Sequence, residues 1–121
     1  MANPTSPICD TEVFTIASAA SVSDAINIGN RIPVGLFIPA AWTAASVTLQ
    51  SSLDGTTWAD VYDTAGSELA ITGTAGGFMS IDIAGLLGIG THLRLRSGTT
   101  GTPVNQGAER LLSLRIGRPT V

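Results

Sequence analysis

The segment Ser46-Val-Thr-Leu-Gln-Ser-Ser-Leu-Asp-Gly-Thr-Thr-Trp-Ala-Asp-Val-Tyr62 places an Asp-Gly pair between two short runs of alternating character. Val47 and Leu49 fall on one face of an extended chain and polar residues fall on the other, which is the pattern of a half-buried β-strand. Gly55 accepts a positive φ without strain from a Cβ, so Asp54-Gly55 indicates a hairpin between the two runs. This segment therefore predicts antiparallel β-structure.

Similar short runs recur along the rest of the chain, and Gly, Pro, Asn or Asp separates them. The expected strands are Glu12–Ala17, Ala25–Ile28, Arg31–Ile38, Ser46–Ser51, Thr57–Tyr62, Glu68–Ile71, Gly77–Ile83, His92–Ser97 and Glu109–Ile116. No stretch keeps a 3.6-residue period, although Ile83–Ile89 is compatible with a single helical turn. Seven to nine short strands with frequent turn signals predict an all-β fold, namely an antiparallel, jelly-roll-like β-sandwich.

The domain organisation follows from the length of 121 residues, which fits one domain. Residues 1–11 contain Pro4 and Pro7 and show no periodicity, so we expect an extended N-terminal arm. Residues 12–121 are then expected to form a single β-sandwich domain.

The charge balance excludes several classes of partner. Six Arg and no Lys stand against nine acidic residues, and the net charge is −3, so nucleic acid is not expected as a partner. No apolar run approaches the ~20 residues that cross a bilayer, and the first residues lack the pattern of a secretory signal, so we expect no membrane association. Charged residues make up only 12% of the chain, about half the usual ~25% share. A surface with so little charge is easily desolvated, which favours contact with other subunits over a monomer with a Ser/Thr-rich surface.

Catalytic chemistry is not indicated by the sequence. The single histidine, His92, and the single cysteine, Cys9, are far apart, and no nucleophile–base pair, zinc spacing or phosphate-binding loop occurs. We therefore expect no enzymatic activity, no catalytic residue, no metal and no cofactor. Four acidic residues without calcium-loop spacing are expected to cap turns and strand edges: Asp54, Asp60, Asp63 and Glu68.

Larger side chains supply the candidate contacts. Trp42 and Trp58 are compatible with a sugar-stacking platform, but tryptophan in a β-sandwich is more typical of a core or an interface. Arg94 and Arg96 project from one face of their strand, where they could bind acidic residues of a neighbouring subunit or face solvent. The strand Arg31–Ile38 and the loop Gly98–Ala108 are further candidate contact elements.

Two segments carry a resemblance to a known group of proteins. The first is Pro39-Ala-Ala-Trp42 followed by Val47–Tyr62, and the second is Leu93-Arg-Leu-Arg-Ser-Gly-Thr99 followed by Pro103-Val-Asn-Gln106. Together they resemble small virion-structural proteins of tailed bacteriophages, of the capsid decoration or cement type, with a β-sandwich fold. The resemblance spans roughly residues 28–116.

This resemblance implies a capsid decoration protein that binds the outer shell and stabilises contacts between capsomers. The expected partners are the major capsid protein and copies of the chain itself, and the expected location is the virion, assembled in the host cytoplasm. Two alternatives remain open: a head-fibre or tail-associated carbohydrate-binding module that binds a host-surface glycan, and a head–tail or tail structural subunit. The candidate subunit-contact residues are Trp42, Trp58, Arg94, Arg96, Pro103 and Asn105.

Overall fold

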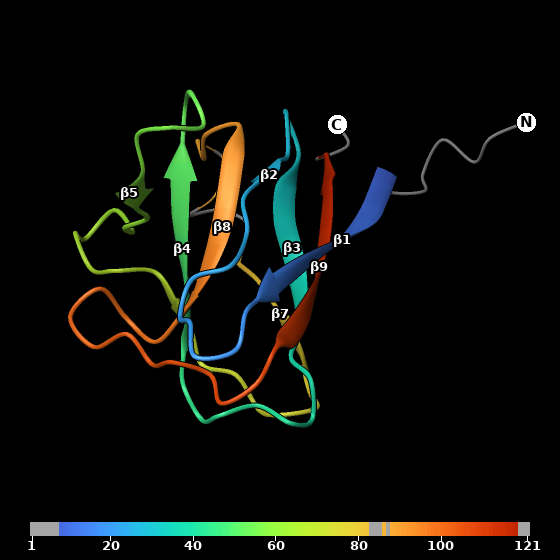
Figure 1. Cartoon of the computed structure of the whole chain (residues 1–121). Coiled ribbons are helices and arrows are strands. Elements are labelled where there is room, and N and C mark those ends of the chain that lie inside the picture. Colours follow the sequence, from blue (N-terminus) through green and yellow to red (C-terminus); the bar gives the residue numbers. More distant parts are fainter. Residues whose placement is uncertain (1–7, 83–85, 87, 119–121) are drawn as a thin grey trace, which may run out of the picture.

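The structure is a computed structural model that describes residues 8–82, 86 and 88–118. Over these residues the chain forms nine β-strands and two antiparallel sheets that face each other, as Figure 1 shows. This confirms the prediction of an all-β sandwich. The strands are β1 (Ile8–Ile16), β2 (Ile26–Asn27), β3 (Ile32–Phe37), β4 (Val47–Ser52), β5 (Ala59–Asp60), β6 (Ala70–Ile71), β7 (Phe78–Ser80), β8 (His92–Ser97) and β9 (Arg110–Arg118).

The connectivity is that of a jelly roll. One sheet, called sheet A, has the order β1-β9-β3-β7, and the other, called sheet B, has the order β2-β8-β4-β5 with β6 also paired to β4. Along the chain, the first four strands alternate between the two sheets, and the later strands β7, β8 and β9 alternate as well. This arrangement is the double-sheet form expected from the sequence. Among the described residues, no helix is long and apolar enough to cross a membrane.

The core consists of the inward-facing residues of both sheets. The alternation predicted in β4, β8 and β9 is confirmed, because Leu49, Leu95 and Leu114 are fully buried while their strand neighbours belong to the opposite face. Burial of one such side chain contributes about 1.5–3 kcal/mol. The fully or almost fully buried apolar core residues are Phe14, Ile16, Ile28, Leu36, Ile38, Val47, Leu49, Leu86, Leu93, Leu95, Leu112, Leu114 and Ile116.

The predicted hairpin joins β4 to β5, but its loop is longer than a two-residue turn. Gly55 has a φ of +84°, as the Asp-Gly pair predicts. Asp54 Oδ1 accepts the backbone N–H groups of Thr56 and Thr57, both at 2.9 Å. Because these two N–H groups are bound to the aspartate, they are not available for hydrogen bonds to β4. The return strand therefore begins only at Ala59. The expected strand Thr57–Tyr62 is therefore shortened to two residues.

The N-terminal part of the chain differs from the expected arm. Strand β1 begins at Ile8 and pairs with β9 over nine residues, from Ile8 opposite Arg118 to Ile16 opposite Arg110. Residues 8–11 therefore belong to sheet A, and Arg31 secures them through an ion pair with Asp10 at 3.2 Å. Residues 1–7 of the expected arm lie outside the described residues, as does most of the helical turn expected in residues 83–89.

Glycine 98 provides a test of this architecture. Gly98 follows β8 with a φ of +94°, and a Cβ at this position would lie 2.4 Å from the carbonyl oxygen of Thr102. We expect Gly98→Ala to lower the free energy of unfolding by at least about 2 kcal/mol, because both the backbone conformation and the contact are unfavourable for alanine.

The matched control is Gly101→Ala in the same loop, since a Cβ there meets no atom within 4 Å. We expect that variant to change the free energy of unfolding by less than about 0.5 kcal/mol, measured for both by urea denaturation. Equal losses for the two variants would contradict the placement of Gly98.

Candidate functional site

The outer face of sheet B carries a buried ion cluster. Arg96 projects from β8 on this face, yet it is only 5% exposed. Its guanidinium forms ion pairs with Asp60 at 2.9 Å and with Glu68. Its Nε donates to Thr48 Oγ1 at 3.0 Å, and the Thr48 hydroxyl donates to the carbonyl of Gly98 at 2.8 Å. The sequence left open whether Arg96 binds a neighbouring subunit or faces solvent, and the structure shows that it binds acidic residues of its own chain.

The two acidic residues of this cluster, Asp60 and Glu68, also accept hydrogen bonds from uncharged groups. The side-chain amide of Gln50 donates to Asp60 Oδ1 at 3.0 Å. This hydrogen bond, with further contributions from Thr100 and Arg96, holds the pKa of Asp60 below its usual value although burial opposes the shift. Glu68 accepts the backbone N–H of Thr100 at 3.1 Å. These contacts join the segment around β5 and β6 to the end of β8, so the cluster has a structural role.

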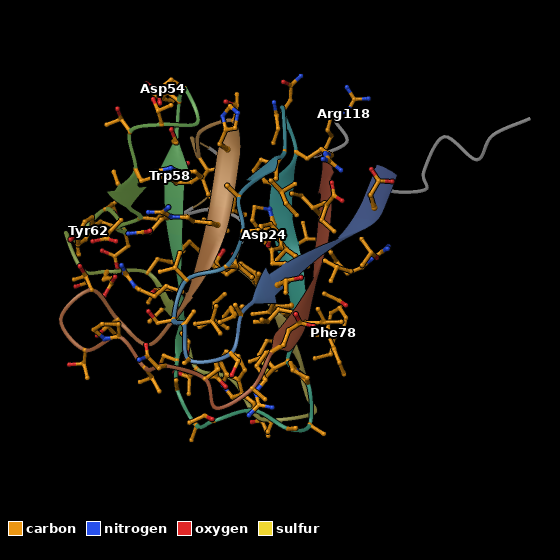
Figure 2. The ribbon with its side chains drawn as sticks, in the orientation of Figure 1. Asp24, Asp54, Trp58, Tyr62, Phe78 and Arg118 are labelled. Carbon is orange, nitrogen blue, oxygen red and sulfur yellow. The ribbon has the colours of Figure 1, made fainter. Side chains whose placement is uncertain are left out.

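Arg94, two residues before Arg96, covers a tryptophan ring. Its guanidinium carbon lies 4.4 Å from the centroid of the Trp58 ring, and its Nε donates to Gln50 Oε1 at 2.7 Å. A guanidinium at this distance stabilises the ring by a cation–π interaction. Both residues remain partly exposed, so they can contribute to a contact on this side of the sandwich, where Figure 2 shows Trp58 and Tyr62.

Trp42, in contrast, belongs to the core. It is 9% exposed, and its indole N–H donates to the carbonyl of Ala45 at 3.2 Å. The sequence left open whether Trp42 is a core or an interface residue, and the structure places it in the core of its own chain. Trp42 and Trp58 therefore do not form one sugar-stacking platform.

The loop after β8 is organised by a residue that the sequence reasoning did not select. Gln106 is fully buried, and its side-chain amide donates to Ser97 Oγ at 2.7 Å and to the carbonyl of Thr43 at 3.1 Å. Pro103 and Asn105 lie on the same loop and are exposed. Their predicted role in subunit contact stays a prediction. Gln106 ends the resemblance segment Pro103-Val-Asn-Gln106, but the sequence did not indicate that its side chain is buried.

Acidic residues at two turns behave as capping groups, as the sequence predicts. Besides Thr56 and Thr57, Asp54 accepts the hydroxyl of Ser52 at 3.0 Å, and these bonds hold the pKa of the Asp54 carboxyl well below its usual range. Asp63 Oδ1 accepts the N–H groups of Ala65 and Ser67, each at 2.9 Å.

The single histidine and the single cysteine, His92 and Cys9, lie in different sheets. Cys9 lies in β1 of sheet A and His92 in β8 of sheet B. The His92 ring nitrogen Nδ1 lies 3.0 Å from the hydroxyl of Thr91. In the part of the chain that the structure describes, no three His, Cys, Asp or Glu side chains are grouped as metal ligands would be.

A groove of about 700 Å³ lies beside the β4–β5 hairpin. Apolar side chains on its wall include Leu53, Val61 and Ile89. Two of its hydroxyl groups are bound within the chain, because Ser51 Oγ accepts the N–H of Gly90 and Ser52 Oγ accepts the N–H of Gly55, both at 2.8 Å. Asp54, Thr57 and Tyr62 also line the groove, so its wall combines apolar and polar side chains.

The outer face of sheet A has a different character. Four large apolar side chains are exposed there, one from each strand, and we call them the sheet A patch: Val13, Phe37, Phe78 and Leu111. Phe78 is 60% exposed, Leu111 50% and Val13 46%. Figure 2 places Phe78 on the side of the sandwich opposite Trp58 and Tyr62. Of these four residues, the sequence placed Phe37 in a candidate contact element, the expected strand Arg31–Ile38, and indicated no contact role for the other three.

Comparisons with known proteins give no relative: no family model, no curated protein and no solved structure matches the chain.

The ion cluster predicts a large effect of one substitution. Arg96→Met keeps the length of the side chain but leaves Asp60 and Glu68 without their cation, and these side chains are only 16% and 14% exposed. We expect a loss of about 3 kcal/mol in the free energy of unfolding, measured by urea denaturation. Arg94→Met, which removes a partly exposed guanidinium from the same strand face, should cost only about 1 kcal/mol. Equal costs would contradict the structural role of the cluster.

The lowered pKa of Asp60 predicts a pH dependence of stability. The carboxylate stabilises the folded state above the unfolded pKa of about 3.9, and this contribution is lost as the pH falls through the lower folded pKa. We expect the free energy of unfolding to decrease below about pH 4, and to decrease less steeply in Asp60→Asn, which has no carboxyl at this position. Urea denaturation between pH 2.5 and pH 7 measures both slopes. Identical slopes below pH 4 would show that Asp60 does not contribute.

Proposed function

We propose that this chain is a structural assembly protein without catalytic function, which binds a neighbouring protein through the sheet A patch. The observation that carries this proposal is the patch itself, because it joins exposed side chains of all four strands of one sheet. Contiguous exposed apolar surface on a soluble domain is typical of protein–protein contact sites.

The surroundings of the patch favour a protein over other kinds of ligand. Among the outward-facing residues of the four strands, Arg115 is the charged one, and its guanidinium donates to Thr11 Oγ1 at 2.9 Å. A phosphate backbone requires clustered cations, which this face does not provide. A sugar requires aromatic faces together with converging polar groups, and neither Trp42 nor the covered ring of Trp58 supplies such a site.

The setting that we propose is the virion of a tailed bacteriophage, with the chain as a decoration protein on the capsid shell. Two observations support this setting. The sequence segments around Trp42, Trp58 and Arg96 resemble such proteins, and the jelly roll is an architecture that viral capsid domains use. The same architecture also occurs in lectins, so the character of the surface, and not the fold, favours assembly. Weak contacts that are repeated over a symmetric shell add up through multivalency.

The direct test is the copy number of the chain in purified particles, measured by quantitative mass spectrometry. A decoration protein should be present in hundreds of copies, whereas six or twelve copies would place the chain at the neck or tail. Absence from particles would overturn the proposed function.

A matched pair of variants tests the role of the patch in the same particles. Phe78→Asp places a charge in the middle of an apolar contact and should lower occupancy more than tenfold. Leu53→Asp changes an 85% exposed side chain at the tip of the β4–β5 hairpin and should leave occupancy unchanged. Normal occupancy of the Phe78→Asp variant would remove the patch from the mechanism.

A further inference from the structure

We propose that the protein bound to the sheet A patch is a second copy of the same chain, so that two sandwiches pack sheet A against sheet A. This inference rests on the proposed function and specifies the partner of the same surface. Its support comes from the geometry of the patch, the distribution of charge around it and its size.

The strand register shows that the patch is continuous. Ser113 in β9 lies between Val13 in β1 and Phe37 in β3, which are its two cross-strand partners. Phe37 in turn is paired with Phe78 in β7. Leu111 is two residues from Ser113 on the same strand face, so it is a diagonal neighbour of both Val13 and Phe37. Val13, Phe37 and Leu111 therefore surround one small serine, and Phe78 extends the patch beyond Phe37.

The patch is also low in profile, which suits packing between sheets. A Cβ at Gly35 would lie 2.6 Å from an atom of the Phe78 ring, so the ring extends over the backbone of β3 and depends on the glycine. Outward-facing neighbours such as Ser113 and Ser80 are small. Sheets pack face to face at about 10 Å when their side chains interdigitate, and a low surface with a few large side chains permits this.

The charge distribution favours a copy of the chain over an unrelated acidic or basic protein. The chain carries a net charge of −3, but none of its acidic residues occupies an outward-facing position in the four strands of sheet A. Two copies that approach through this face therefore keep their acidic groups away from the contact. A strongly charged partner would find only Arg115 to bind.

The charges at the border of the patch are compatible with twofold symmetry. Arg115 lies two residues after Ser113, and Glu109 is exposed two residues before Leu111. In a twofold interface each surface meets a copy of itself, so a patch with a cation at one end and an anion at the other can complement its own charges. An isologous dimer is the simplest assembly with this property.

The size of the patch sets the expected strength of the dimer. Four strands at ~4.8 Å spacing and about five residues at ~3.3 Å give a face of roughly 19 Å by 17 Å. This area is below the ~800 Å² per partner of a standard specific interface. We therefore expect a weak dimer, with a dissociation constant on the order of tens of micromolar, which assembly on a particle would reinforce.

Sedimentation equilibrium between about 5 and 500 µM tests this inference on the purified full chain. We expect the average mass to rise from monomer to dimer over this range. The double variant Phe78→Thr, Leu111→Thr keeps strand-forming residues and removes most of the exposed apolar area, and it should raise the dissociation constant at least tenfold. Leu53→Thr removes a leucine outside sheet A that is even more exposed, at 85%, and should leave the dissociation constant unchanged.

Hydrogen exchange at the two ends of this concentration range locates the contact. Protection that increases with concentration in β1, β9, β3 and β7 supports the proposed dimer. A chain that stays monomeric at 500 µM, or a dimer that the double variant leaves intact, overturns it. If such a chain is still found in particles, the proposed function stands and the sheet A patch binds a different protein there.

Discussion

The structure depends on one constraint, which is that each strand can bury only one of its two faces in the shared core. Leu49 in sheet B and Leu114 in sheet A illustrate the buried faces. Each sheet therefore has a second, outward-facing side, and the two outer sides differ in their side chains. The outer face of sheet B is closed by its own polar side chains around Arg96, whereas sheet A exposes the apolar side chains of the sheet A patch.

This difference is also a difference in chemistry. On sheet B, cross-strand neighbours satisfy one another: Arg96 binds Thr48 directly opposite, and Arg94 binds Gln50 directly opposite. The acidic residues Asp60 and Glu68 then complete a network that leaves little for a partner to bind. On sheet A the outward-facing residues other than Arg115 are uncharged, and exposure of the apolar ones to water costs free energy that a partner can recover. We therefore place the proposed contact on sheet A.

Much of this fold could be predicted from alternation and turn residues alone. The faces of β4, β8 and β9 follow from their leucines, and Asp54-Gly55 gives the hairpin. The exact ends of strands could not be predicted, because hydrogen bonds to side chains compete with the hydrogen bonds between strands. The backbone N–H of Thr57, for example, donates to the carboxylate of Asp54. The burial of Arg96 was missed since it depends on Glu68, 28 residues away along the chain. The patch was missed for a similar reason: its residues become neighbours only once the strand order is known.

The central claim is that the outer face of sheet A is covered by protein when the chain is assembled. Hydroxyl-radical footprinting of the dilute chain and of assembled particles tests it directly. The account predicts that Phe78 and Leu111 lose most of their labelling in the assembled state, while Leu53 at the far hairpin keeps more of its own. Unchanged labelling of Phe78 and Leu111 in assembled particles would contradict the account.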